Sequence, residues 1–268
     1  MMKHYTPFQN FDVNAVRFTL GVDSKGKPQL SMSCEPAGGE VAMVTPAAVT
    51  QWPRCTGDGN FGTMWGPTDA SKTKFTLDLT DQPISGTEIN ADYEKFKAIV
   101  EAIDDKLLDF VTENQSRILG RKNLTREEVK MLQVRTARQK IDKLTGQPTG
   151  YTVDLKTPKF AWDGQGGKYE RKVTICDYQG NAVANGTVKP GDVVAATMHC
   201  NSVYNGMAGD KFGISYGFQD VSVVCQRSNL EDKTHVSAFQ NVEWSCGKPY
   251  VDQVSEPIHN GTCLEQFA

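Results

Sequence analysis

Hydrophobic residues recur with two different spacings along the chain, and the spacing changes near residue 90 and again near residue 148. In residues 13–34, two mainly apolar runs surround a turn-forming Gly-Lys-Pro segment, which predicts a β-hairpin. In residues 73–79, Phe75, Leu77 and Leu79 share one face, as expected for a half-buried strand. The first part of the chain is therefore expected to be rich in β-structure.

Residues 90–111 have a different pattern, with apolar side chains at a spacing of three and four, which predicts an amphipathic helix. Thr125 and Glu128 then have the spacing of a capping box and predict the start of a second helix. We expect this second helix to run to Leu144. Together the two helices form a helical hairpin, residues 90–146, inserted in a β-rich chain.

After residue 148, four or five short apolar segments separated by Gly, Asn and Pro predict an antiparallel barrel or sandwich. In the last segment the apolar residues up to Phe218 occupy even positions, whereas those from Val221 occupy odd positions. A β-bulge near Gln219 and Asp220 would bring both sets to one face. The fold class predicted is mainly β with a helical insertion (α+β).

Domain organisation follows from the same pattern. Residues 1–228 are expected to form a single domain, and residues 229–268, which lack periodicity and contain two prolines, a C-terminal extension. The full length of 268 residues, with 38% hydrophobic and 23% charged residues, fits a globular protein and excludes disordered, collagen-like and coiled-coil classes.

The sequence lacks the signatures of several classes of protein and of functional site. The chain has neither a long apolar run nor an apolar N-terminal stretch, so we expect an intracellular protein that is not secreted and does not contact a membrane. Its seven cysteines are an odd number without a Cys-x-x-Cys pair, which favours reduced thiols over a zinc site or a disulfide framework. No nucleophile elbow, phosphate loop or dinucleotide-binding motif is present. We therefore expect no catalytic residue, no metal and no cofactor.

Charge is distributed unevenly between the two predicted helices. Residues 117–143 contain nine Lys or Arg against three Asp or Glu, whereas residues 90–116 contain three against seven. Two interpretations remain open at this point. Either the two helices attract each other through solvated faces, or the basic segment follows a phosphate backbone with the acidic helix turned away.

Aromatic residues alternate with basic residues in two stretches, a pattern typical of single-strand nucleic-acid binding, in which bases stack on rings and cations neutralise phosphates. The side chains of Phe160 and Trp162, which share one face of a predicted strand, could equally belong to the core. The candidates in the first stretch are Lys156, Lys159, Phe160, Trp162, Lys168, Tyr169, Arg171 and Lys172. The candidates in the earlier, loop-like stretch are Trp52, Arg54 and Trp65.

A short motif lies near the end of the predicted domain. It comprises Gly191-Asp192-Val193 at a strand start, Tyr204 in that strand, a glycine-rich turn, and a strand that begins Gly213-Ile214-Ser215. This pattern resembles the closing strands of the OB-fold single-stranded DNA-binding proteins of phages and large DNA viruses. The resemblance implies an OB-fold-like antiparallel barrel and adds Tyr204 and Lys211 to the candidate nucleic-acid contacts.

The function that the resemblance implies is non-catalytic, sequence-independent binding of single-stranded DNA in viral DNA replication, recombination or repair, inside the host cell at the site of viral DNA replication. The expected partners are single-stranded DNA and replication proteins, and a homodimer is left open. The alternative is a virion structural, capsid-associated protein without nucleic-acid-binding activity. A third possibility is an RNA-binding OB module.

Overall fold

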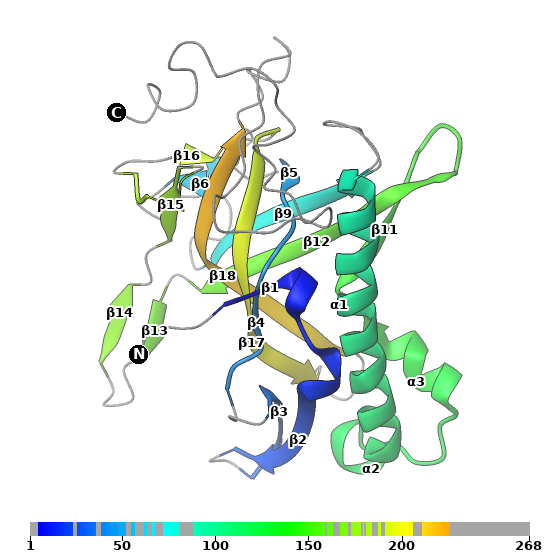
Figure 1. The fold of residues 1–268 in the computed structure, drawn as a ribbon. Helices are drawn as coiled ribbons and strands as arrows, with labels where there is room; N and C mark the ends of the chain where they lie inside the picture. Colours follow the sequence, from blue (N-terminus) through cyan, green and yellow to red (C-terminus); the bar gives the residue numbers. More distant parts are fainter. Residues whose placement is uncertain are drawn as a thin grey trace, which may run out of the picture.

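A curved β-sheet with one long helix along its side forms the centre of the computed structural model (Figure 1). The structure describes residues 5–23, 26–35, 39–51, 55–56, 62–63, 66–67, 72–80, 88–158, 160–162, 167–170, 173–177, 179, 181–183, 187–188, 191–205 and 211–225. The predicted boundary at residue 228 and the predicted C-terminal extension lie outside these ranges.

The strands of the first half of the chain are β1 (Thr6–Pro7), β2 (Val16–Val22), β3 (Pro28–Cys34), β4 (Ala42–Val44), β5 (Ala48–Gln51), β6 (Cys55–Thr56), β7 (Gly62–Thr63), β8 (Gly66–Pro67) and β9 (Lys72–Thr80). Those of the second half are β10 (Gln133–Val134), β11 (Ala137–Ile141), β12 (Pro148–Pro158), β13 (Phe160–Trp162), β14 (Lys168–Glu170), β15 (Thr174–Cys176), β16 (Thr187–Val188), β17 (Val193–Asn205) and β18 (Phe212–Cys225). The helices are η1 (Phe8–Asn10), η2 (Val13–Ala15), α1 (Glu88–Glu113), α2 (Gln115–Ile118) and α3 (Arg126–Leu132).

The main sheet is built around the long antiparallel pair β17–β18. On its other edge, β17 pairs with β4 and β5, and from β5 the order continues through β9 and β12 to β11. Short parallel pairs add β1 to β4, and β10 and β15 to β18. The predicted class, mainly β with a helical part, is confirmed, although the sheet is mixed rather than purely antiparallel.

The predicted bulge near Gln219 and Asp220 is confirmed, because these two residues of β18 lie opposite the single residue Thr197 of β17. The Thr197 hydroxyl accepts hydrogen bonds from both backbone N–H groups, at 3.2 and 2.8 Å, and donates to the Asp220 carbonyl. Phe218 and Val221 are consequently both buried, on opposite sides of the bulge.

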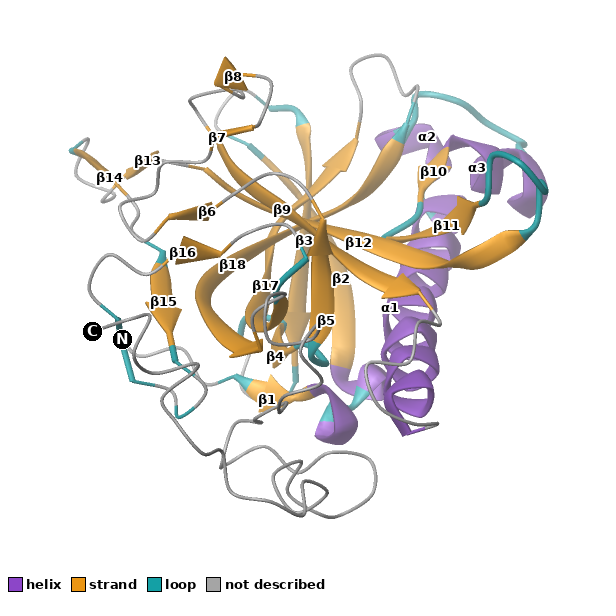
Figure 2. Ribbon diagram, turned by 90° about the horizontal axis from the view of Figure 1, so that it is seen from above, coloured by secondary structure: helices purple, strands orange, loops and turns teal. Residues whose placement is uncertain are grey.

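Helix α1 is confirmed and is an integral part of the core. Its apolar stripe includes Phe96, Val100, Ile103 and Leu107, all fully buried in the same cluster as the strands. Phe96 meets Phe8 of η1 edge to face, with ring centroids 5.8 Å apart. Figure 2, turned to look from above, shows α1 lying along one side of the sheet.

The second predicted helix is correct at its start and wrong in its length. Thr125 and Glu128 form the capping box, in which the Thr125 hydroxyl accepts from the Glu128 N–H and the Glu128 carboxylate accepts from the Thr125 N–H. The helix nevertheless ends at Leu132, and residues 133–141 form β10 and β11. Pairing with the distant strand β18 and with the following strand β12 therefore outweighs the local helix propensity of a Gln-, Arg- and Lys-rich segment.

The pairing around the sheet is interrupted between β12 and β18, so the sheet is not closed by a continuous ladder. At this seam the Thr157 hydroxyl donates to the Phe218 carbonyl at 2.7 Å and accepts from the Phe218 N–H at 2.8 Å. The Asn201 side-chain amide crosses over Gly217 and donates to the carbonyl of Lys156. Side chains thus join the two strands at points where no backbone ladder does.

Among the described residues, three hairpins lie outside this sheet: β2–β3, β7–β8 and β13–β14. β2 and β3 pair in register from Val16 to Val22, which confirms the predicted N-terminal hairpin. β13 pairs with β14, with Ala161 opposite Tyr169. Within the described ranges, no helix is both long and apolar enough to cross a membrane.

Candidate nucleic-acid interface

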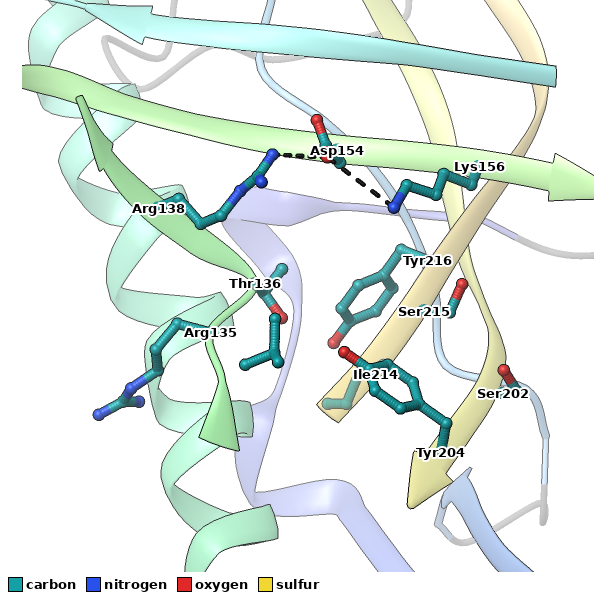
Figure 3. Close-up of a pocket in the computed structure, with 11 residues that line it drawn as sticks. Arg135, Thr136, Arg138, Asp154, Lys156, Ser202, Tyr204, Ile214, Ser215 and Tyr216 are labelled. Atoms are coloured by element: carbon teal, nitrogen blue, oxygen red, sulfur yellow. Dashed lines mark ion pairs between the residues drawn. The ribbon is translucent and has the colours of Figure 1, made fainter. Parts of the chain in front are cut away.

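A cleft of about 390 Å³ opens where the sheet is interrupted (Figure 3). It lies between β10, β11 and β12 on one side and the ends of β17 and β18 on the other. Its lining residues are Val134, Arg135, Thr136, Arg138, Asp154, Lys156, Ser202, Tyr204, Ile214, Ser215 and Tyr216. The structure therefore brings residues that are distant in sequence to one concave site, whose walls are both polar and apolar.

The cleft exists because one segment of chain pairs with two different strands. Val134 in β10 pairs with Gly213 of β18, whereas Ala137 in β11 pairs with Val153 of β12. Between them, residues 135–136 pair with neither strand. Within the described part of the chain, the outer edge of β18 at residues 214–216 also has no paired strand.

The buried carboxylate of Asp104 in α1 holds this break in place. Its two oxygens accept hydrogen bonds from the N–H and the hydroxyl of Thr136, at 2.7 and 2.8 Å. The Gln133 side-chain amide donates to the Asp104 backbone carbonyl at 2.6 Å. Helix α1 is therefore the element that positions the inner wall of the cleft.

Burial raises the pKa of Asp104 to about 6, although the two Thr136 hydrogen bonds and the Arg135 guanidinium oppose this shift. Between about pH 4 and pH 6 the folded protein therefore holds a proton on Asp104 that the unfolded chain has released. The contribution of Asp104 to the free energy of unfolding is larger below this window and falls as the pH rises through it.

We expect Asp104→Asn to remove this pH dependence. In the wild-type protein, raising the pH from about 4 to about 7 should lower the Asp104 contribution by roughly 2–3 kcal/mol, the energy that corresponds to a shift of about two pKa units. Urea unfolding of both proteins across this range measures the difference between them. Asp105→Asn, which leaves Asp104 in place, is the matched control. Parallel stability curves for the wild type and Asp104→Asn would contradict the assignment.

Two cations lie at the rim of the cleft, on either side of one carboxylate. Arg138 of β11 forms an ion pair with Asp154 of β12 at 2.5 Å, and the Lys156 Nζ lies 4.0 Å from the same carboxylate. The side chains of Arg138 and Lys156 are 52% and 46% exposed. Two positive charges against one negative charge leave the rim with excess positive charge that solvent can reach.

Tyr204 lies at the end of β17 opposite Gly213, its cross-strand partner. A Cβ atom at position 213 would come within 2.8 Å of both the Tyr204 hydroxyl and the Val134 carbonyl. Glycine is therefore required here, because the tyrosine ring and β10 both occupy the space that any other side chain would fill. Tyr204 is half-buried, and Figure 3 shows its ring projecting into the cleft.

Tyr216 of β18 projects into the same space but is only 2% exposed. Its hydroxyl makes no hydrogen bond of normal geometry; the Thr136 hydroxyl, which lies near it, donates to Asp104. Burial and the Asp104 charge both raise the pKa of the Tyr216 hydroxyl, so it stays protonated.

The sequence-predicted residues fall into four groups. Lys156 and Tyr204 line the cleft, whereas Lys211 is exposed just before β18 and is not part of the lining. Phe160, Trp162, Lys168 and Tyr169 belong to the β13–β14 hairpin, of which the structure describes the backbone only. Trp52, Arg54, Trp65, Lys159, Arg171 and Lys172 lie outside the described residues.

Several residues that line the cleft are not among the candidates predicted from the sequence. The sequence predicts a helix at Arg135 and Arg138, whereas Arg135 lies in the break between β10 and β11 and Arg138 lies in β11. Tyr216 has the parity of a core residue, and it is in fact buried. The usable signal was the Gly213-Ile214-Ser215 motif, because Gly213 provides the room for Tyr204 and the next two residues line the cleft.

The acidic helix and the basic segment are connected by surface ion pairs. Arg126 Nε lies 2.8 Å from Asp109, and Arg135 lies 2.8 Å from Asp105. The first interpretation, in which the two segments attract each other, is therefore correct for these two pairs. Arg138 pairs across the sheet instead, with β12. Among the described residues, no group of three or more His, Cys, Asp or Glu side chains could hold a metal ion.

Comparisons with known proteins find similarity at the level of structure only, because no family model and no curated protein sequence matches the chain. The structure is similar to that of gp2.5, a single-stranded DNA-binding protein encoded by bacteriophage T7, with 8% identity and a TM-score of 0.48, covering 84% of this chain and 100% of that one. It is also similar to the single-stranded DNA-binding protein from bacteriophage Enc34, with 8% identity and a TM-score of 0.39, covering 84% and 96%. A third similar structure is the Enc34 protein in complex with single-stranded DNA, with 10% identity and a TM-score of 0.38, covering 78% and 96%. Identities and TM-scores this low assign no residue role to this chain.

Proposed function

We propose that this protein binds single-stranded DNA without catalysis, and that the cleft between β11, β12 and β18 is part of its binding surface. The observation that carries the proposal is the combination of exposed cations at the rim, Arg138 and Lys156, with a tyrosine ring, Tyr204, in one open cleft. Cations that follow phosphates and rings on which bases stack are the two components of single-strand binding. The single-stranded DNA in the solved Enc34 complex shows what the Enc34 protein binds.

The cleft favours a single strand over a duplex for a physical reason. A ring can stack only on a base whose face is free, and in a duplex the neighbouring base pairs cover both faces. Backbone contacts by Arg138 and Lys156 do not depend on base identity, so binding should occur with any sequence. This activity would serve viral DNA replication, recombination or repair inside the host cell. Replication proteins would be its partners there.

The experiment that tests the function compares fluorescently labelled single-stranded and duplex oligonucleotides at two salt concentrations. We expect tighter binding to the single strand and a loss of roughly tenfold in affinity between about 50 and 200 mM salt, because two or three phosphate contacts release counterions. Binding that is absent at low salt would contradict the proposal and favour the virion structural alternative. Equal affinity for both DNA forms would contradict the role of stacking, and tighter binding to an RNA strand would favour the RNA-binding module.

A further inference from the structure

The polar groups of the cleft change in kind from the rim to the interior. The cations Arg138 and Lys156 lie at the rim with about half of each side chain exposed. The interior carries neutral hydroxyl groups instead: Thr136 and Tyr216 are buried, and Ser215 is half-buried. This order fits a nucleotide whose phosphate stays outside while its base enters.

An anion would be disfavoured in the interior. The Asp104 carboxylate lies directly behind Thr136, which donates its hydroxyl to it at 2.8 Å. Burial, and after it the Asp104 charge, raises the pKa of the hydroxyls of both Tyr204 and Tyr216, so the field of Asp104 reaches the cleft. The interior is therefore suited to a neutral group, and in particular to one that donates hydrogen bonds.

The hydroxyl groups also have a defined direction. Because Thr136 donates to Asp104, the oxygen of its hydroxyl offers only lone pairs to its other neighbours. The Tyr216 hydroxyl, which has no partner of normal geometry, can then turn its hydrogen towards Thr136 and its lone pairs towards the cleft. The Tyr216 hydroxyl oxygen can therefore accept a hydrogen bond from a donor in the cleft.

We propose that the cleft is a pocket for one nucleobase, and that the Tyr216 hydroxyl oxygen accepts a hydrogen bond from the exocyclic amino group of cytosine or adenine. Thymine presents a carbonyl oxygen at the corresponding position and cannot donate there. A protein that binds any strand would thus bind strands rich in amino-bearing bases more tightly. This inference rests on the proposed function and adds a base preference to it.

The test compares oligonucleotides of 5-methylcytosine with oligonucleotides of thymine of the same length. Both are pyrimidines with the same methyl group, so they differ only in the hydrogen-bonding edge. We expect the wild-type protein to bind the 5-methylcytosine strand about fivefold more tightly, the factor that one net hydrogen bond supplies. Tyr216→Phe should reduce this ratio to less than about twofold without loss of the cooperative melt, because it removes only the hydroxyl and keeps the buried ring in place.

The matched control is Tyr93→Phe, which removes another tyrosine hydroxyl, one that donates to the Ala47 carbonyl away from the cleft. This variant should retain the wild-type ratio. Equal affinity of the wild type for the two strands would contradict the proposed base pocket but not the proposed binding of single strands. A preference that persists in Tyr216→Phe, or that disappears in both variants, would overturn the pocket as well. Absence of binding to either strand would contradict the proposed function itself.

Discussion

Reversing two charges at the rim of the cleft, with Arg138→Glu and Lys156→Glu in one chain, is expected to lower the affinity for single-stranded DNA by about 100-fold or more at low salt. The two substitutions remove two phosphate contacts and place two further carboxylates beside Asp154. The remaining affinity should also depend less steeply on salt, because fewer counterions are released on binding. Fluorescence anisotropy with a labelled single strand over a range of salt concentrations measures both effects.

The control for this experiment is the double variant Lys27→Glu and Lys122→Glu. It changes the net charge by the same amount at two exposed positions that do not line the cleft. We expect it to lower the affinity several-fold at most, through the general field of the protein, which salt screens. Similar losses in both double variants would mean that net charge, and not the cleft, determines binding. Thermal melts of both variants verify that the fold is retained.

Leu107→Ala is expected to destabilise the protein by about 2–5 kcal/mol, since the side chain is fully buried where α1 packs on the sheet. Leu144→Ala is the matched control, because this leucine lies in the turn between β11 and β12 and is 96% exposed. That variant should change the stability by less than about 0.5 kcal/mol. Urea unfolding measures both. A loss below about 0.5 kcal/mol for Leu107→Ala would mean that α1 is an appendage and not part of the core.

Local patterns in the sequence predicted several of the individual elements. The β2–β3 hairpin, helix α1, the capping box at Thr125 and the bulge at Gln219 and Asp220 each depend on residues close together in the chain. In each case the spacing of apolar or capping residues determines the geometry, so the sequence pattern and the structure agree.

The cleft could not be predicted in the same way, because it depends on the pairing of β10 with the distant strand β18. Residues 133–141 have good helix formers, and only the edges of β18 and β12 make this segment a broken strand. The break itself depends on Asp104, one of the acidic residues of the helix predicted at residues 90–111, which is fully buried. No periodicity distinguishes an acidic residue that is buried by one tertiary contact from its exposed neighbours.

The resemblance to viral single-stranded DNA-binding proteins rested on the motif around Tyr204 and Gly213, and these residues meet at the cleft. The aromatic and basic candidates of residues 159–172 and 52–65 remain predictions. The same holds for the roles of a C-terminal extension and of a homodimer. A virion structural protein would need no open cleft with exposed cations, and it would show no difference between single-stranded and duplex DNA.

The most direct test of the central claim locates bound DNA on the protein. A single-stranded oligonucleotide containing 5-iododeoxyuridine is bound at low salt and irradiated, and the cross-linked peptides are identified by mass spectrometry. Because a stacked base lies against its aromatic partner, we predict a cross-link in the peptide that contains Tyr204, which is lost at high salt and in the Arg138→Glu, Lys156→Glu double variant. Cross-links confined to segments away from the cleft, with none in the strands β17 and β18, would contradict the assignment of this cleft as the DNA-binding site.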